Sequence, residues 1–228
     1  MSKKKVFTLA LAVCLIAILS LSSLAWFTDD DSVTNDFLIA GSDDANPDEV
    51  FSIDVTETGD DEDDGLVYED ILPGDVLKKE VFVENTGSYD QYARVIVVVS
   101  NAREWMAAMD KTGTQYPALS QIVNGLNTGN WDPATANNPH YNEEDNTFWY
   151  VLYVKEILEI DEKVKVFDSV KIPETMTRED AAAFAGGFSI KVVAQAVQTK
   201  NLGVDNAAAA FNVIGWTEEA AYEQIMNP

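Results

Sequence analysis

The residue types that usually perform chemistry are unevenly distributed in this chain. It contains one histidine, His140, and one cysteine, Cys14, against 39 aspartate and glutamate residues. A zinc site needs several His or Cys ligands at fixed spacing, and a typical serine hydrolase needs a Gly-x-Ser-x-Gly turn as well as a histidine. The sequence has neither pattern. We therefore expect no catalytic residues, and we expect His140 to be a surface side chain.

Carboxylates are the remaining ligand type, and their densest run is Asp-Asp-Glu-Asp-Asp-Gly at residues 60–65. Asp60, Glu62 and Asp64 are spaced like the first ligands of an EF-hand loop, with Gly65 in the position of its sharp turn. The twelfth position of such a loop is a bidentate glutamate, but here it is Ile71. The run is therefore a candidate for loose calcium binding. The alternative is a charged loop that keeps a neighbouring sheet edge soluble. We expect no other cofactor.

The first 25 residues have the layout of a secretory signal peptide. Three lysines precede an uncharged run from Val6 to Leu24, and small residues stand at Ser23 and Ala25. Signal peptidases cut after this pattern, so we predict cleavage between Ala25 and Trp26 and export of the remainder. The alternative is an uncleaved membrane anchor, because the run approaches the roughly 20 residues that span a bilayer.

The predicted mature protein is strongly acidic. Three of the 15 basic residues and none of the 39 acidic residues precede the cut, so cleavage changes the formal net charge from −24 to about −27. Such a charge repels nucleic acid and anionic membrane surfaces, and it makes self-association depend on ionic strength. Cys14 is removed with the leader, so the fold must depend on a buried core instead of disulfides.

The rest of the chain has the periodicity of a β protein. Apolar and polar side chains alternate over residues 51–56, and further strands are predicted at 76–84, 92–100, 147–154, 163–172 and 187–199. Val95–Val99 is apolar on both sides, which predicts a strand in the middle of a sheet, between two layers. Turns are predicted at Pro73-Gly74 and at Asn85-Thr86-Gly87, each with its glycine at positive φ.

Short helices are predicted in insertions between the strands. Two of them lie in an insertion at about residues 101–146, which is otherwise loop. A third helix starts at Thr177, with Asp180 completing a capping box, and a fourth starts at Thr217. The sequence therefore predicts a mainly β fold at residues 50–228, a jelly-roll-like two-sheet β-sandwich, behind a segment and linker at residues 26–49.

Several motifs, in this order, resemble the TasA and camelysin (CalY) proteins of Gram-positive bacteria. The motifs are Ala25-Trp26-Phe27-Thr28-Asp29 after the leader, the turn Pro73-Gly74-Asp75, the strand end Asn85-Thr86-Gly87, and the late strand FSIKVVAQAVQTKNL followed by Trp216. The resemblance covers both ends and residues 72–99, but it says little about residues 101–146. It implies a jelly-roll fold, processing by a dedicated signal peptidase of the SipW type, and location in the extracellular matrix or at the cell surface.

The resemblance also implies a mechanism of assembly. In that family the mature N-terminal segment of one subunit completes a sheet in the next, so subunits polymerise into biofilm-matrix fibres by donor-strand complementation. The corresponding segment of this chain offers these candidate assembly residues: Trp26, Phe27, Val33, Phe37 and Ile39. The alternative is that the segment is an edge strand of its own domain. An accessory or anchoring matrix protein is a further expected partner.

Two other functions stay open at this level. Camelysin has been described as a metallopeptidase, so the resemblance also allows a secreted peptidase, although no residues here are identified that would hold a catalytic zinc. An uncut N-terminal run would instead give a membrane-tethered surface binding module. The aromatic run at residues 148–153 predicts a core strand, with carbohydrate or matrix binding as its alternative.

Overall fold

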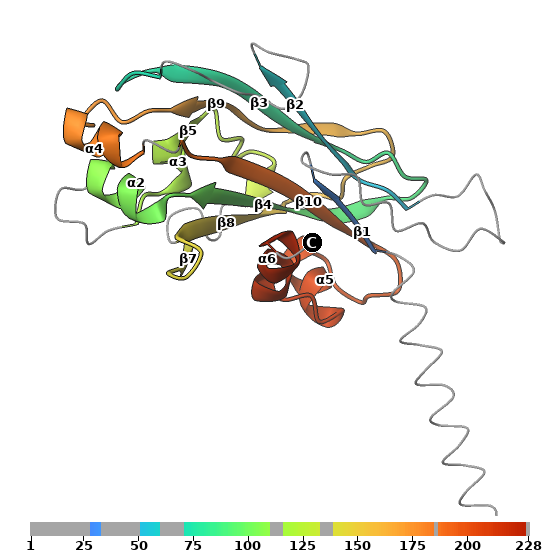
Figure 1. Cartoon of the computed structure of the whole chain (residues 1–228). Helices are drawn as coiled ribbons and strands as arrows, with labels where there is room; N and C mark the ends of the chain where they lie inside the picture. Colours follow the sequence, from blue (N-terminus) through green and yellow to red (C-terminus); the bar gives the residue numbers. More distant parts are fainter. Residues whose placement is uncertain are drawn as a thin grey trace, which may run out of the picture.

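Two antiparallel β-sheets packed face to face form the body of the molecule (Figure 1). The computed structural model describes residues 28–32, 51–59, 71–109, 116–132, 139–184 and 187–226, and for residues 28–32 it describes the backbone alone. Short helices lie at one end of the sheets and over one outer face. The predicted mainly β, two-sheet architecture is confirmed. The jelly-roll connectivity stays a prediction.

The larger sheet, sheet A, has β4 at its centre. Its order is β1-β10-β4-β8-β6, and β7 also pairs with β8. The bounds are β1 (Thr28–Ser32), β10 (Ile190–Gln198), β4 (Gln91–Ser100), β8 (Thr147–Val154), β6 (Trp131–Asp132) and β7 (His140–Asn142). Every residue of β4 except Ser100 is buried. The prediction that Val95–Val99 lies mid-sheet between two layers is confirmed.

The smaller sheet, sheet B, has the order β2-β3-β9-β5. The bounds are β2 (Asp54–Gly59), β3 (Val76–Glu84), β9 (Lys163–Lys171) and β5 (Val123–Asn124). In β3, buried Val81 and Val83 alternate with the half-buried Phe82 and Glu84, as expected for a sheet with one face on the core and one in solvent. The predicted strands at 76–84 and 163–172 are therefore confirmed to within a residue.

The hydrophobic core lies between the two sheets. It includes Val95 and Val97 of β4, Phe148 and Leu152 of β8, and Val81 and Phe167 of sheet B, all with 0% of their surface exposed. Burial of each such side chain stabilises the fold by about 1.5–3 kcal/mol. The core thus supplies the stability that a chain without disulfides requires.

Three helices cluster near one end of the sandwich: α2 (Ala102–Met109), α3 (Leu119–Ile122) and α4 (Arg178–Ala183). The buried Trp105 of α2 packs edge-to-face on Phe184 and Phe188, with ring centroids 5.7 and 5.1 Å away. The predicted capping box of α4 is confirmed, since the N–H of Asp180 donates to Thr177 Oγ1 at 3.2 Å and Asp180 Oδ2 accepts from the N–H of Thr177 at 2.7 Å.

The helices α5 (Ala207–Val213) and α6 (Glu218–Met226) cover the outer face of sheet A (Figure 1). Arg94 of β4, only 1% exposed, anchors them. Its guanidinium donates to Gln195 Oε1 at 2.7 Å and to the carbonyl of Trp216 at 2.9 Å, and it lies 4.2 Å from the centre of the Phe211 ring. Sheet A is therefore the middle layer of three.

One predicted turn is confirmed and the other is wrong in detail. Gly74 has φ +89°, as a turn after Pro73 requires. Gly87 is not among the glycines with positive φ in the described chain. Instead, the fully buried Asn85 closes the turn, because its Oδ1 accepts the N–H of Gly87 at 3.0 Å while its Nδ2 donates to the carbonyl of Leu158 at 3.1 Å. The turn is therefore held by the Asn85 side chain and does not require a positive φ at Gly87.

Candidate functional site: the edges of the sandwich

A strand from the N-terminal region forms one edge of sheet A. β1 pairs antiparallel with β10, with Thr28 opposite Val197 and Ser32 opposite Val193. The assembly residues named above (Trp26, Phe27, Val33, Phe37 and Ile39) and the predicted cut after Ala25 lie outside the described residues. Within one chain, then, part of the expected assembly segment is the edge strand of its own domain.

The composition of β1 is unusual for a β-strand. The strand reads Thr-Asp-Asp-Asp-Ser, and aspartate is among the residues depleted in β-strands. Its pairing with β10 depends on backbone N–H and C=O groups, which any extended segment can offer. In the described chain, β1 occupies the β10 edge through these backbone groups.

The edge strand of sheet B, β2, is protected in a different way. Glu57 of β2 and Lys79 of β3 form an ion pair in which the side chains are only 8% and 9% exposed. Charged residues that point inward from an edge strand oppose its pairing with a further strand. The added strand would bury the charges more deeply or separate the ion pair, and an unpaired buried charge is costly. The β2 edge is thus a poor candidate for assembly.

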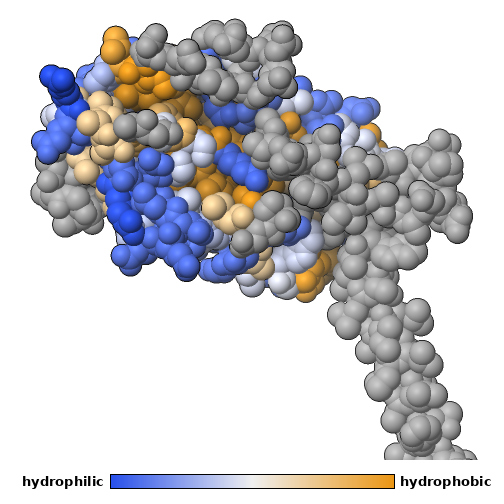
Figure 2. All heavy atoms as spheres, viewed as in Figure 1, coloured by the Kyte–Doolittle hydropathy of each residue, from blue (hydrophilic) through white to orange (hydrophobic). Residues whose placement is uncertain are grey.

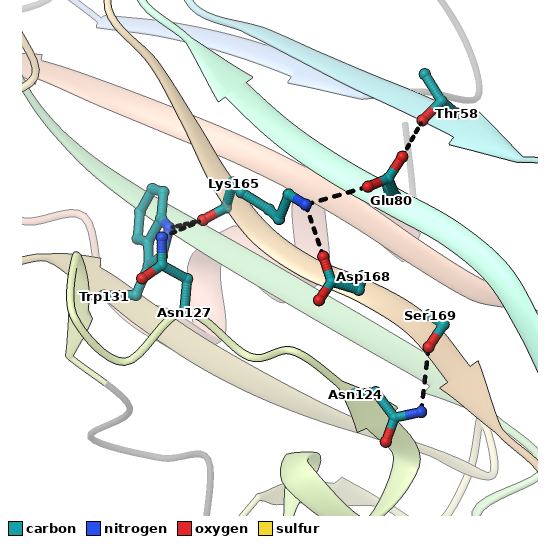
Figure 3. Close-up of polar contacts among 8 residues, drawn as sticks. All are labelled: Thr58, Glu80, Asn124, Asn127, Trp131, Lys165, Asp168 and Ser169. Atoms are coloured by element: carbon teal, nitrogen blue, oxygen red, sulfur yellow. Dashed lines mark hydrogen bonds and ion pairs between the residues drawn. The ribbon is translucent and has the colours of Figure 1, made fainter.

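The outer face of sheet B carries a polar ladder (Figure 3). Lys165 Nζ donates to Asp168 Oδ1 at 2.7 Å and to Glu80 Oε1 at 3.1 Å, and Thr58 Oγ1 donates to Glu80 Oε2 at 3.3 Å. The hydrogen bond and charge of Lys165 hold the pKa of Glu80 below its usual range, and Asp168 and then Glu80 raise the pKa of Lys165. The charges on this face pair with one another and are partly exposed to solvent. We therefore interpret this ladder as a structural feature.

The far edge of sheet B is closed by a loop. Trp131 Nε1 and Asn127 Nδ2 both donate to the carbonyl of Lys165, at 2.9 and 3.0 Å (Figure 3). Next along the sheet, Asn124 Nδ2 donates to Ser169 Oγ at 3.1 Å. These contacts tie residues 124–131 to β9, and β5 itself is only two residues long. Little backbone is therefore offered to a partner on this side.

The only histidine of the chain contacts α6. His140 Nε2 lies 2.8 Å from Glu218 Oε2, and Tyr153 donates to the other oxygen of that carboxylate at 2.8 Å. The imidazole also stacks on Trp149 with ring centroids 4.8 Å apart, and the side chain is 29% exposed. Sequence reasoning missed this contact, because Glu218 is 78 positions away and neither residue lies in a recognisable pattern.

The aromatic run of β8 packs on both faces of sheet A. Phe148 and Tyr150 are fully buried and Trp149 is 6% exposed, so the prediction of a core strand is confirmed. The hydroxyl of Tyr150 donates to the carbonyl of Pro117 at 2.7 Å, and burial raises its pKa. Trp149 stacks on Tyr222 of α6 with ring centroids 4.0 Å apart. These rings serve to dock layers on one another.

The candidate calcium ligands Asp60, Glu62 and Asp64 lie outside the described residues. Within the part of the chain that the structure describes, no group of three His, Cys, Asp or Glu side chains is placed to hold a metal ion. In that same part, none of the helices has the length and apolar character needed to cross a bilayer.

Comparison with protein-family models, with curated proteins and with solved structures finds no match for this chain. Its function must therefore be argued from its own geometry. Within the described residues, one edge of sheet A is formed by β1, a short strand from the N-terminal part of the chain that pairs with β10.

Proposed function

We propose that this protein is an exported structural protein that self-associates into extracellular fibres by exchanging its N-terminal strand. In the fibre, β1 of one copy pairs with β10 of the next copy. The observation that carries the proposal is the pairing of β1 with β10 within one chain. It defines an edge, a strand that fits the edge, and a register.

The energetic cost of exchange is low. The same backbone hydrogen bonds form whether β1 comes from the same chain or from another, which is the general reason that identical elements swap between protomers. Residues 33–50 join β1 to the remainder of the described chain, and when extended they reach up to about 60 Å. This length allows β1 to leave its own domain and reach a neighbour.

Two features of the sequence support the extracellular setting. The layout of residues 1–25 is that of an export signal, and the motifs that follow resemble TasA and camelysin proteins, whose assembly uses an N-terminal donor strand. That resemblance also suggests a dedicated signal peptidase and an accessory matrix or anchoring protein as partners, and the biofilm matrix as the destination.

Disulfide trapping between two tagged copies tests the exchange. One copy carries Ser32→Cys and the other Val193→Cys, at positions directly opposite in the β1–β10 register. Opposed residues of an antiparallel pair have Cα atoms about 4.5–5.5 Å apart, which suits a disulfide. If the predicted cleavage removes Cys14, these are the only thiols. We expect a disulfide between the two tags under assembly conditions.

The matched control is Thr28→Cys with Val193→Cys. These positions are four residues out of register, or about 13 Å along the strand, so they should not form a bond in the same mixture. If the Ser32→Cys and Val193→Cys copies never join, but a chain carrying both substitutions closes internally, strand exchange is wrong and β1 is only an edge strand.

Deletion of residues 26–39 tests the proposal at the level of the fibre. The truncated protein should remain a folded monomer and form no filaments in electron micrographs. Persisting filaments would contradict the role of the segment.

The two alternative functions have tests of their own. Mass spectrometry of the secreted protein distinguishes the processed protein, which starts at Trp26, from the membrane-tethered alternative, which keeps residues 1–25. Chelator-sensitive casein cleavage by the pure protein would favour the peptidase alternative.

A further inference from the structure

The lysines of this acidic protein are concentrated on two neighbouring strands of sheet B. Three of the 15 basic residues precede the predicted cut, which leaves twelve against 39 acidic residues. β3 and β9 together carry five of those twelve basic residues and three acidic ones. The five are Lys78, Lys79, Lys163, Lys165 and Lys171. These two strands are therefore locally positive on a protein whose net charge is about −27.

The outer face of these strands has an aromatic centre and a charged rim. Phe82 of β3 is half-buried and lies between Lys163 and Lys165 of β9, each with its Nζ 5.3 Å from the centre of the ring. Lys163 also pairs with Glu84 at 3.3 Å. Lys165 pairs with Glu80 at 3.1 Å. An aromatic residue surrounded by charged and polar groups is the usual anatomy of a protein–protein interface.

The charged side chains of this face reach solvent. Those of Lys163 and Lys165 are 43% and 35% exposed, and those of their glutamate partners are 32% and 31% exposed. The helices α5 and α6 lie on the opposite side of the molecule, over sheet A (Figure 1). On the sheet B side, Figure 2 shows hydrophilic surface toward the right, near the start of β9. The face can therefore meet a partner.

The register of β3 and β9 makes this face complementary to itself. Glu84 stands opposite Lys163, and one step further along Phe82 stands opposite a second lysine, Lys165. A two-fold axis parallel to the strands and midway between them exchanges β3 with β9. The acidic position then meets a lysine of the second copy, and the aromatic position meets the other lysine. A contact in which residue i meets j and j meets i is the isologous contact of a dimer.

Charge also favours this face over the remainder of the surface. Two strongly acidic molecules repel one another, and the repulsion is weakest where the facing charges are balanced or opposite. An isolated surface ion pair contributes little, whereas a network of several charges contributes more. In the two-fold contact, Lys163 lies between its own Glu84 and that of the second copy. Two ion pairs thereby become one network across the interface.

We propose that the outer face of sheet B is a contact surface between two copies of this chain, with Phe82 at its centre. The polar ladder keeps its structural role within one chain and gains a second role between chains. The contact is independent of strand exchange, because it uses the face of sheet B, whereas the exchange uses the β1–β10 edge of sheet A. Strand exchange links copies along a fibre, and this contact joins copies side by side.

A charge-swap experiment tests the contact. One protein carries Glu84→Lys and the other carries Lys163→Glu, so each variant alone brings like charges together across the two-fold axis. Only an equimolar mixture restores opposite charges on both sides. We expect each variant alone to associate about tenfold more weakly than the wild-type protein, because like charges at a contact are costly, and we expect the mixture to recover. Light scattering and sedimentation of the processed proteins measure the association.

The matched controls carry the same changes of charge away from this face. Glu156→Lys and Lys200→Glu are at exposed positions outside the strands of sheet B. They report the effect of net charge alone, so their mixture should behave as the average of its two components. Recovery that is equally large in the control mixture would overturn the proposal.

Phe82→Ala tests the centre of the contact without a change of charge. We expect this variant to associate about tenfold more weakly, since aromatic residues at the centre of an interface carry much of its binding energy. Val213→Ala, at a 54% exposed position on α5, is the matched control and should change little. Association of Phe82→Ala at the wild-type level would overturn the proposal.

The outcomes distinguish this contact from strand exchange. Glu84 and Lys163 lie on sheet B, so strand exchange contributes equally to all the charge-swap samples. The disulfide between the Ser32→Cys and Val193→Cys copies reports the exchange separately. If the charge-swap mixture stays as weak as its components, the contact is overturned whatever the disulfide shows. Recovery of the mixture without the disulfide supports the contact and contradicts the exchange.

Discussion

At the residue scale, Gly125 shows how one side chain is excluded by a neighbour. It follows β5 with φ +66°, and a Cβ there would collide with the carboxylate of Asp168. That carboxylate is held in place by Lys165, whose Nζ donates to its Oδ1 at 2.7 Å. The turn after β5 and the polar ladder of sheet B therefore depend on one another.

Gly125→Ala should lower the free energy of unfolding by more than backbone strain alone, which costs about 1–3 kcal/mol for a residue held in the left-handed region. Gly203→Ala is the matched control, because Gly203 has φ +70° with nothing within 4 Å of the added Cβ. Urea unfolding of both variants measures the difference. If Gly203→Ala costs as much as Gly125→Ala, the contact with Asp168 has no role.

Tyr153 links burial to the pH dependence of stability. It is 9% exposed, and burial followed by its hydrogen bond to Glu218 raises its pKa to about 12. The folded state therefore favours the neutral phenol, compared with a pKa of about 10 in an unfolded chain. The stabilisation is complete below pH 10 and is lost as the pH rises toward 12.

We expect the wild-type protein to lose about 2 kcal/mol of unfolding free energy from this group between about pH 10 and pH 12. Tyr153→Phe removes the phenol and should lack that part of the loss, although it gives up the hydrogen bond to Glu218. Urea unfolding at several pH values measures the difference between the two proteins. Parallel pH profiles would contradict the assignment.

At the scale of elements, β2 and β3 share a buried ion pair that marks the edge of sheet B. Glu57 and Lys79 are nearly excluded from solvent, so each leaves an uncompensated charge when the other is removed. The β10 side of sheet A is instead covered by β1 of the same chain. The two sheets thus end in different ways, one at a strand with a buried ion pair and the other at a short aspartate-rich strand.

Lys79→Met should cost about 3–5 kcal/mol of unfolding free energy, whereas Glu57→Leu combined with Lys79→Met should recover most of that loss. The double variant should also associate more readily, since its β2 edge no longer carries inward charges. A double-mutant cycle in urea and light scattering give the two measurements. Additive losses in the cycle would show that the two charges do not interact.

The prediction of elements from the sequence succeeded where a strand pattern is local. The strands at 76–84, 147–154 and 163–172 are strongly apolar or alternating, and each is found within a residue of its predicted bounds. The short strands β6 and β7 fall in a stretch expected to be loop, because two or three residues show no periodicity and pair only through β8. The contact of α6 with His140 was equally invisible, since it joins residues far apart in the chain.

At the scale of the whole molecule, charge governs association. The formal net charge is −24 and becomes about −27 after the predicted cleavage, so copies repel one another over a distance set by the salt. The proposed strand exchange acts only at contact, where backbone groups pair. The balance between the two effects depends on ionic strength.

We expect assembly to be much slower at about 10 mM salt, where the Debye length is about 30 Å, than at about 150 mM, where it is about 8 Å. Light scattering of the processed protein at matched concentrations measures the rate. Sodium chloride and a calcium salt at equal ionic strength separate screening from cation binding by the acidic segments. Assembly that is insensitive to salt would show that repulsion is not the barrier.

The sequence by itself determined the mainly β class, the central position of β4, the capped helices and the strongly acidic charge, because each follows from local periodicity or composition. It also supplied the prediction of export and the candidate donor segment. Only the tertiary structure decided that β1 lies on β10, and that α5 and α6 cover sheet A through Arg94. These features depend on contacts between residues far apart in the chain, and the hydrophobic periodicity of a short segment does not predict such contacts.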